Sequence, residues 1–332
     1  MGTKEEDWVE HLFVASAHEY LMIFTRSGQC HWLKVWQVPP SGRHSRGKPI
    51  VNLLNIDPSD AIASVVPVRE FSDDQYLLFC TRDGKIKKTA LSAYGNVRTV
   101  GLIGINIREG DELIDVQLTD ADNEVILASK NGLAIRFRES DARLMGRVAE
   151  GVRGIRLGAD DEVVGMVVVA RDEATLLVVS ESGMGKRSEI EAYRLQGRGG
   201  KGVINLKTTE RTGKVVAIKS VVPGDQLMVI TRNGVINRQH IDEIRVIGRA
   251  TQGVRLVNLD DGDSVMDVAR VIPEDPAGAS SSGATDGDGT GGGGVDSDGA
   301  DGDGADGGEG PNASVDSGSP DTVGVDPDNE GG

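Results

Sequence analysis

Glycines and cations alternate in the stretch Gln196-Gly197-Arg198-Gly199-Gly200-Lys201-Gly202. No acidic residue lies between Ala192 and Thr209. Because glycine has no Cβ, such a loop can bring its backbone and its positive side chains close to a phosphate chain. The chemistry that this stretch predicts is therefore the binding of phosphate groups.

The stretch has relatives elsewhere in the chain, which identifies it as part of a repeat. The pattern Gly-Arg-x-x-x-Gly occurs at residues 42–47, 146–151, 197–202 and 248–253, and a degraded copy runs from Gly95 through Arg98 to Gly101. The last three complete copies are 51 residues apart. A fixed period of this length predicts a repeat array.

Other motifs that the glycines resemble lack their required context. A dinucleotide fingerprint at Gly197, Gly199 and Gly202 needs a following helix, and an apolar β-type run follows instead. A P-loop needs lysine where Val203 stands. No carboxylate pair suggests acid–base chemistry, the five histidines show no ligand spacing, and Cys30 and Cys80 lie in strand-like sequence. We therefore predict no catalytic residue and no metal site, and reduced cysteines that serve packing.

Short apolar runs that end in polar-glycine turns predict antiparallel strands. Such hairpins end at Gly28, Gly84, Gly132, Gly183 and Gly234. Each is followed by a strand that is often basic, then by a glycine-arginine loop, an apolar strand, an acidic turn and one more strand. About four strands in about 50 residues predict the blade of a radial all-β array. A β-solenoid is the structural alternative, but its repeats are usually shorter.

The formal charge of −16 is unevenly distributed. Residues 273–332 contain 15 acids and no Lys or Arg, which leaves 37 acids against 36 bases in the rest of the chain. We therefore expect two parts: a nearly neutral folded body at 1–272 and a Gly/Asp/Ser-rich tail at 273–332. The tail has too few large apolar residues to offset chain entropy, so its composition predicts disorder. No apolar run approaches the length of a membrane span, and we expect a cytoplasmic protein.

Charge also sorts by position within the repeat. Residues 20–56 and 84–108 each contain five bases and no acid, whereas residues 109–129 contain seven acids and no base. One such run is most simply a solvated face, but runs repeated in phase would align as one positive band. A band of this kind suits the backbone of a long polyanion. Aromatic residues make up only 4% of the chain, which argues against single-strand stacking and favours duplex DNA.

The candidate phosphate contacts are the cations of the loops and of one basic strand. They are Arg43, Arg46, Lys48, Lys87, Arg98, Arg147, Arg198, Lys201 and Arg249.

These residues resemble a known family, the C-terminal domain of the DNA gyrase A subunit. Residues 196–202 are similar to its seven-residue box, and residues 45–53, 151–157 and 248–254 resemble degenerate copies. The resemblance covers roughly residues 4–272. It implies a six-bladed β-pinwheel that wraps duplex DNA, giving the holoenzyme ATP-dependent negative supercoiling. The corresponding domain of the topoisomerase IV A subunit, which resembles this family, and a propeller that serves as a protein-interaction scaffold remain alternatives.

The same resemblance implies what lies outside the chain. Its partners would be the breakage-reunion part of the A subunit, together with the gyrase B subunit, in an A2B2 holoenzyme. ATP and Mg²⁺ would be used there rather than in this chain. The family's strict box usually precedes a segment similar to Lys4-Glu5-Glu6-Asp7, with which this chain almost begins. We therefore expect a truncated subunit whose first blade is incomplete. The acidic tail resembles family tails, some of which modulate wrapping.

Overall fold

The computed structural model describes residues 15–40, 49–96, 98, 100–120, 122–170 and 173–271. These residues lie in one compact unit, Met1–Pro276, and only this unit is discussed below. Its described part contains nineteen β-strands and six short 3-10 helices but no α-helix. The all-β prediction is therefore confirmed.

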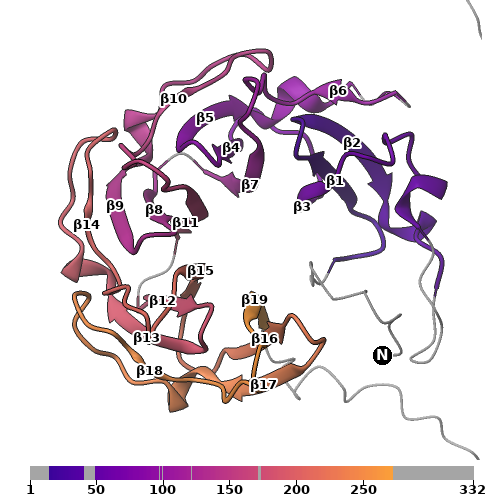
Figure 1. Cartoon of the computed structure of the whole chain (residues 1–332). Coiled ribbons are helices and arrows are strands. Elements are labelled where there is room, and N and C mark those ends of the chain that lie inside the picture. The colour runs from indigo at the N-terminus through magenta and orange to yellow at the C-terminus, as the bar shows by residue number, and fades with distance from the viewer. Residues whose placement is uncertain are drawn as a thin grey trace, which may run out of the picture. The chain divides into compact units, whose positions relative to one another are not determined.

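The strands form five antiparallel sheets, which we call blades 1 to 5 (Figure 1). From the inner to the outer strand, blade 1 contains β3 (Ile62–Val68), β1 (Tyr20–Thr25), β2 (Gln29–Lys34) and β6 (Leu102–Ile103). Blade 2 contains β7 (Leu113–Thr119), β4 (Tyr76–Thr81), β5 (Lys85–Ala90) and β10 (Val152–Arg153). Blade 3 contains β11 (Val163–Val169), β8 (Glu124–Ser129), β9 (Leu133–Arg138) and β14 (Val203–Ile204).

Blade 4 contains β15 (Val215–Val221), β12 (Thr175–Ser180), β13 (Met184–Glu189) and β18 (Val254–Arg255). Blade 5 contains only β19 (Val265–Val271), β16 (Gln226–Thr231) and β17 (Ile236–His240). The 3-10 helices are η1 (Val35–Gln37), η2 (Ile50–Asn52), η3 (Leu91–Tyr94), η4 (Glu139–Asp141), η5 (Ile190–Ala192) and η6 (Ile241–Glu243). In all five blades a 3-10 helix directly follows the third strand, counted from the inner one.

Each outer strand comes from the repeat that follows its blade. Val152 of β10, for example, pairs with Ile86 of β5 across more than sixty residues of sequence. The exchange interlocks consecutive blades, and it leaves β17 of blade 5 without a fourth strand among the described residues. Two expectations are therefore wrong for this part of the chain. It forms five blades rather than six, following its five hairpins, and the incomplete blade is the fifth, whereas the first has four strands.

The five predicted hairpin turns are confirmed, and their glycines have φ angles between 73° and 87°. Most of these glycines also serve the strand exchange. A Cβ on Gly132 would lie 2.2 Å from the carbonyl oxygen of Leu206, which belongs to the following repeat. At Gly234 of blade 5 no atom lies within 4 Å of that position. Glycine at this turn position is thus required by packing and by backbone conformation in blade 3, and by backbone conformation alone in blade 5.

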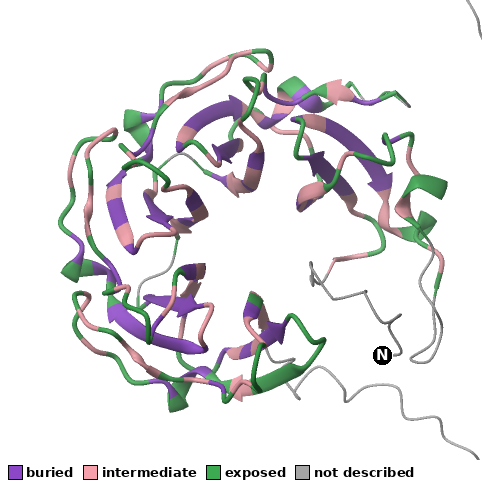
Figure 2. Ribbon diagram, in the orientation of Figure 1, coloured by how far each residue is buried: buried purple, intermediate pink, exposed green. Residues whose placement is uncertain are grey.

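The hydrophobic core lies between the blades (Figure 2). Strand β8 shows the arrangement, because its alternate side chains enter different clusters. Val125 and Leu127 pack with residues of blade 2, whereas Ile126 and Ala128 pack with residues of blade 4. A strand that is covered on both faces needs no polar alternation, which explains the nearly continuous apolar runs of the hairpins.

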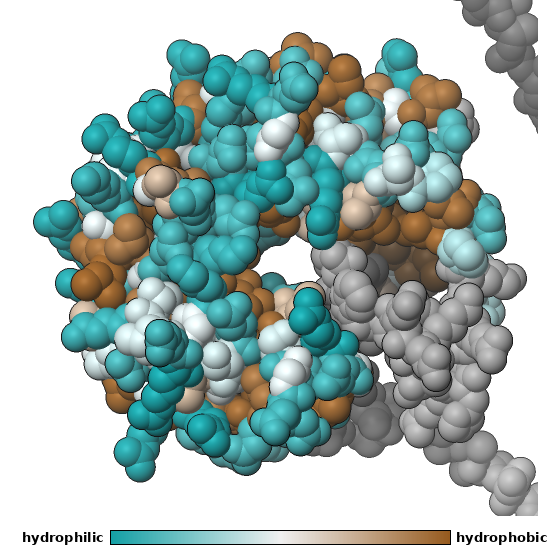
Figure 3. Space-filling view, viewed as in Figure 1, coloured by the Kyte–Doolittle hydropathy of each residue, from teal (hydrophilic) through white to brown (hydrophobic). Residues whose placement is uncertain are grey.

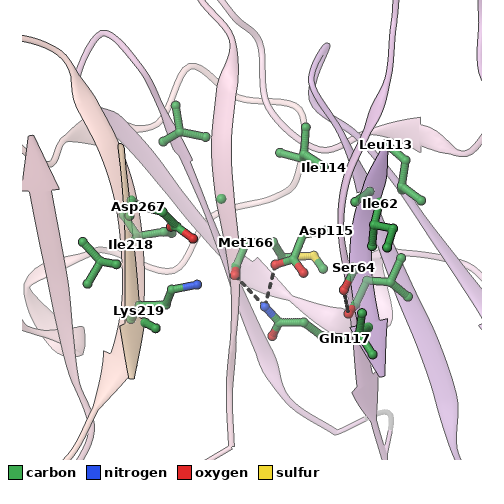
Figure 4. A pocket seen from close by; sticks show the side chains of 18 of the residues that line it. Ile62, Ser64, Leu113, Ile114, Asp115, Gln117, Met166, Ile218, Lys219 and Asp267 are labelled. Atoms are coloured by element: carbon green, nitrogen blue, oxygen red, sulfur yellow. Dashed lines mark hydrogen bonds between the residues drawn. The ribbon is translucent and has the colours of Figure 1, made fainter. Parts of the chain in front are cut away.

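A cavity of about 600 Å³ lies at the centre, lined by the inner strands of all five blades (Figure 4). In the space-filling view both hydrophilic and hydrophobic residues border the opening (Figure 3). Gln117 spans part of its wall, because its Nε2 donates to Asp115 Oδ2 at 2.8 Å and to Met166 O at 2.7 Å. Its Oε1 accepts from the backbone amide of Val168 at 3.1 Å. These bonds join the inner strands of blades 2 and 3, so we interpret this wall as structural.

Candidate nucleic-acid interface

Three glycine-rich loops follow one another along the outer edge of the blades (Figure 1). We call them loop 2 (residues 146–151), loop 3 (residues 197–202) and loop 4 (residues 248–253), after the blades whose outer strands they precede. Each loop accepts a backbone hydrogen bond from the segment that follows the outer strand of the preceding blade. The bonds are Asn106 N to Ala149 O (3.3 Å), Arg156 N to Gly200 O (2.8 Å) and Lys207 N to Thr251 O (3.0 Å).

The three accepting residues are 51 residues apart, so the links repeat with the sequence period. We call the three loops and the outer strands that they precede the loop band. Because each link joins one blade to the next, the loops lie on one outer circumference rather than on opposite faces. This is the arrangement that the repeated charge pattern required.

The glycines of the loops have different tasks. Gly202 has φ +78°, and a Cβ there would lie 2.3 Å from the carbonyl oxygen of Ala134 in β9. The final glycines of loops 2 and 4 meet strand carbonyls in the same way, at 2.5 Å for Gly151 and 2.6 Å for Gly253. Gly197, by contrast, has no atom within 4 Å of its would-be Cβ. The last glycine of each loop is thus fixed by blade packing, and the first leaves open space for a ligand.

Most of the predicted cations that the structure describes lie on or near this surface. Arg198 and Lys201 of loop 3 are exposed, as is Arg98 just before β6 of blade 1. Arg147 of loop 2 and Arg249 of loop 4 are half-buried. Gln196, the first residue of the box, is also half-buried, and its backbone N–H donates to Arg136 O at 3.0 Å. Three further candidates, Arg43, Arg46 and Lys48, lie outside the described residues.

Lys87 differs from the prediction because its side chain is buried. Its ammonium donates to the carbonyl oxygen of Gly104 and, at 2.6 Å, to that of Arg147. It also lies 4.6 Å from the centre of the Phe79 ring. Burial and, secondly, the charge of Arg147 lower the Lys87 pKa to about 7. Lys87 therefore supports loop 2 from the inside of the blade and does not offer its charge to a ligand at the surface.

Lys186 of β13 repeats this contact two blades further along, at loop 4. Its buried ammonium donates to Gly248 O at 3.0 Å and to Arg249 O at 2.6 Å. Burial and, secondly, the charge of Arg249 lower its pKa to about 8. In blade 3 the corresponding residue of the strand is Ile135, which is fully buried. The strictest loop is thus supported by an apolar residue.

The expectation that the basic strands contribute to the outer band is also wrong for the strand position that follows Lys87, Ile135 and Lys186. Arg136 of β9 donates through Nη1 to Ile190 O at 2.9 Å and to Tyr193 O at 3.0 Å, at the 3-10 turn of blade 4. Arg136 is half-buried, and Lys88 and Arg187, at the same strand position, are buried. Because each strand is covered on both faces, these cations join neighbouring blades.

Sequence reasoning missed a second set of surface cations. Arg143, Arg194 and Arg245 are exposed, and each precedes a loop arginine by four residues. Their spacing of 51 residues is the signal that could have found them. Loop 2 also contains an acid, Glu150, whose Oε2 lies 2.5 Å from Arg108 Nε and 3.2 Å from Lys85 Nζ. These two bonds lower the Glu150 pKa. Lys201 occupies the corresponding position of loop 3, which makes that loop the most cationic.

Sequence comparison assigns the repeats to one family. Five segments match the DNA gyrase C-terminal domain, beta-propeller: residues 19–69, 75–120, 123–170, 174–221 and 225–272. Together they cover well over half of the chain. The chain belongs to this family. The resemblance inferred from the box and its period is thereby confirmed.

Similar proteins include subunits of DNA gyrase. The DNA gyrase A subunit of Salmonella typhimurium is 42% identical over 268 residues, which cover 81% of this chain and 30% of that protein. The chain thus spans about a third of the length of the relatives that it matches.

Two solved structures are similar in fold. The C-terminal domain of DNA topoisomerase IV has a TM-score of 0.71 at 27% identity, covering 77% of this chain and 80% of that one. The DNA gyrase A C-terminal domain has a TM-score of 0.68 at 26% identity, covering 78% and 84%. The fold is therefore common to gyrase and topoisomerase IV domains, whereas the relatives named from sequence are gyrase subunits.

The described part of this gyrase-family domain shows no grouping that suggests chemistry. Its residues include no cluster of three or more His, Cys, Asp or Glu side chains that could hold a metal ion. Cys30 and Cys80 are free and buried, as predicted, and burial raises the pKa of both thiols. None of its helices has the length and apolar composition needed to cross a membrane.

Proposed function

We propose that this domain binds duplex DNA along the loop band and wraps it around the outer edge of the blades. The observation that carries the proposal is the set of three backbone links at 51-residue spacing. It places the exposed cations of successive repeats on one circumference. A duplex that follows this edge would meet phosphate-binding groups at each blade, and these contacts depend on backbone charge rather than on base sequence.

Duplex DNA fits this edge better than single-stranded nucleic acid does. Loops 2, 3 and 4 contain no aromatic residue, whereas single-strand binding commonly relies on aromatic stacking. No long helix is present among the described residues to enter a major groove. We therefore expect little base readout, with any sequence preference coming from the cost of bending the duplex.

We further propose that the chain acts as part of a gyrase A subunit. Its partners would be the breakage-reunion part of that subunit, together with the gyrase B subunit, in an A2B2 holoenzyme in the cytoplasm. Wrapping would present a crossing of defined sign to the cleavage core, so that ATP-driven strand passage introduces negative supercoils. ATP and Mg²⁺ would be used by those other parts, and this chain would contribute DNA geometry.

The decisive experiment measures the affinity of this chain for a plasmid fragment across a salt series. Arg198→Ala combined with Lys201→Ala should weaken binding and lower the salt slope by about 0.9 for each phosphate that the variant no longer neutralises. Arg69→Ala combined with Lys219→Ala removes the same charge from the residue after β3 and from the inner strand β15, and should leave affinity almost unchanged. Equal affinity of the loop double variant and the parent would refute loop 3 as a contact site.

Two other functions make different predictions. A protein-interaction scaffold predicts no DNA binding by the parent chain at moderate salt. Topoisomerase IV, favoured by the structural similarity to its C-terminal domain, predicts DNA binding without supercoiling. A supercoiling assay of the reassembled enzyme decides between gyrase and topoisomerase IV.

A further inference from the structure

The arginines of loops 3 and 4 make the same pair of hydrogen bonds, one repeat apart. Arg198 donates from Nε to Asp141 O at 2.8 Å and from Nη1 to Arg153 O at 3.1 Å. Arg249 donates from Nε to Ala192 O at 3.0 Å and from Nη1 to Ile204 O at 2.9 Å. The two side chains, 51 residues apart, thus use the same donor atoms. In each case Nε donates to a carbonyl at the end of a 3-10 helix and Nη1 to a carbonyl of an outer strand.

The two acceptors of each arginine belong to different blades. Asp141 ends η4 of blade 3, whereas Arg153 lies in β10, the outer strand of blade 2. Ala192 ends η5 of blade 4, whereas Ile204 lies in β14, the outer strand of blade 3. Each guanidinium therefore crosses one joint of the blade array. The planar guanidinium suits this task, because its donors are held in a fixed fork that the single ammonium of lysine does not reproduce.

Both loop arginines still have a donor group available. The Nη2 atoms of Arg198 and Arg249 make no hydrogen bond with the described residues. The same guanidinium can therefore hold a joint through Nε and Nη1 and offer Nη2 and its charge to a phosphate. For Arg249, the buried ammonium of Lys186 also fixes the backbone carbonyl of the arginine itself.

We propose that Arg198 and Arg249 are positioning residues that set the angle and offset between successive loops, and with them the path of wrapped DNA. The inference rests on the proposed DNA-wrapping function and adds a mechanism to it. A duplex that passes from one loop to the next crosses the joint that the arginine spans. Because DNA is stiff, a small change in this joint alters the bend that the protein imposes. Charge at the loop determines affinity, and the two-carbonyl contact determines wrapping.

The test separates these two properties with Arg198→Lys combined with Arg249→Lys in the full 332-residue chain. Lysine keeps the charge but cannot span both carbonyls in the same fork. Affinity for a linear duplex should change less than about threefold, because the phosphate charge is retained. The slope of affinity against salt concentration should stay the same for the same reason. The linking-number change trapped by ligating nicked plasmid on the protein should fall to about half or less, because the bend is no longer fixed. Arg198→Ala combined with Arg249→Ala should lose both affinity and wrapping.

A matched control changes the same chemistry at sites away from the joints. Arg138→Lys combined with Arg232→Lys should keep the parent's linking-number change. The single variants Arg198→Lys and Arg249→Lys each open one joint and should each lose part of the wrapping. Thermal melts of every variant establish that wrapping is compared between folded proteins.

The outcomes separate the two proposals. Parent-level wrapping by the folded double lysine variant would overturn the positioning role while leaving DNA wrapping intact. Equal losses of affinity and wrapping in the lysine variant would also overturn it, because the arginines would then act as phosphate contacts alone. A parent chain that binds no duplex at low salt would instead refute the proposed function.

Discussion

The buried ammonium of Lys87 donates a hydrogen bond of 2.6 Å to the carbonyl oxygen of Arg147. The two residues are 60 positions apart and belong to consecutive repeats. A cation inside blade 2 thus holds the backbone of the loop that presents another cation outside. Loop 2 is therefore held from the interior of the blade by a titratable group, the ammonium of Lys87.

This titratable support predicts a pH-dependent stability. Burial lowers the folded-state pKa of Lys87 to about 7 from its ordinary value of 10.5. Between these values the unfolded chain holds a proton that the folded chain has released, so the free energy of unfolding rises with pH, by up to about 1.4 kcal/mol per pH unit. Lys87→Met removes this contribution. The parent's stability relative to the variant should therefore increase as pH rises from 7 to 9, measured by urea unfolding.

Lys186→Met provides the comparison. Because the Lys186 pKa is lowered only to about 8, its relative gain in stability should begin at higher pH than that of Lys87. A stability difference between parent and Lys87→Met that does not change between pH 6 and 9 would show that Lys87 has the same proton affinity in both states.

Two glycine-to-alanine substitutions in the same loop should differ strongly in their effect on the free energy of unfolding. Gly202→Ala places a Cβ 2.3 Å from the carbonyl oxygen of Ala134 at a φ of +78°. The left-handed conformation alone costs roughly 1–2 kcal/mol, and the backbone clash adds to it. We expect a loss in the free energy of unfolding above about 2 kcal/mol, measured by urea or thermal unfolding.

Gly197→Ala is the matched control within the same loop. No atom lies within 4 Å of its would-be Cβ, so stability should change by less than about 1 kcal/mol. If Gly197→Ala weakens DNA binding while leaving stability intact, the open space at this glycine is used by the ligand. Equal stability of the two variants would contradict the packing role of Gly202.

Local sequence signals predicted the elements of this fold well. The hairpin ending at Asp83-Gly84 and the apolar run from Leu77 to Cys80 have conformational reasons that act within a few residues. The exchange of outer strands could not be predicted in this way. Val152 and Arg153 form a strand of only two residues, and its partner Ile86 comes from the previous repeat. Nothing in so short a segment specifies its partner.

The candidate site was predicted from its repeats but not in its details. The period of 51 residues located Arg198, Arg249 and the loops around them, because equivalent positions of a repeat array lie on equivalent surfaces. Lys87 was misplaced because a basic residue in a strand was taken to be exposed. The strand is instead covered on both faces, and a lysine there is tolerated since loop carbonyls accept its hydrogen bonds. Burial of this kind depends on neighbouring blades that sequence alone does not show.

The acid-rich tail at residues 273–332 leads to a last prediction, which concerns the regulation of DNA binding. They carry 15 acids and no base, whereas the loop band carries exposed cations. A polyanion attached to the same chain is present at high effective concentration and would compete with DNA for those cations. Deleting residues 273–332 should therefore tighten binding of a plasmid fragment at low salt, and the gain should shrink as salt rises and screens both interactions. The control replaces the fifteen acids by Asn and Gln at unchanged length and should reproduce the gain. Unchanged affinity in both variants would remove the competition, and a gain from the deletion alone would assign the effect to the bulk of the segment rather than to its charge.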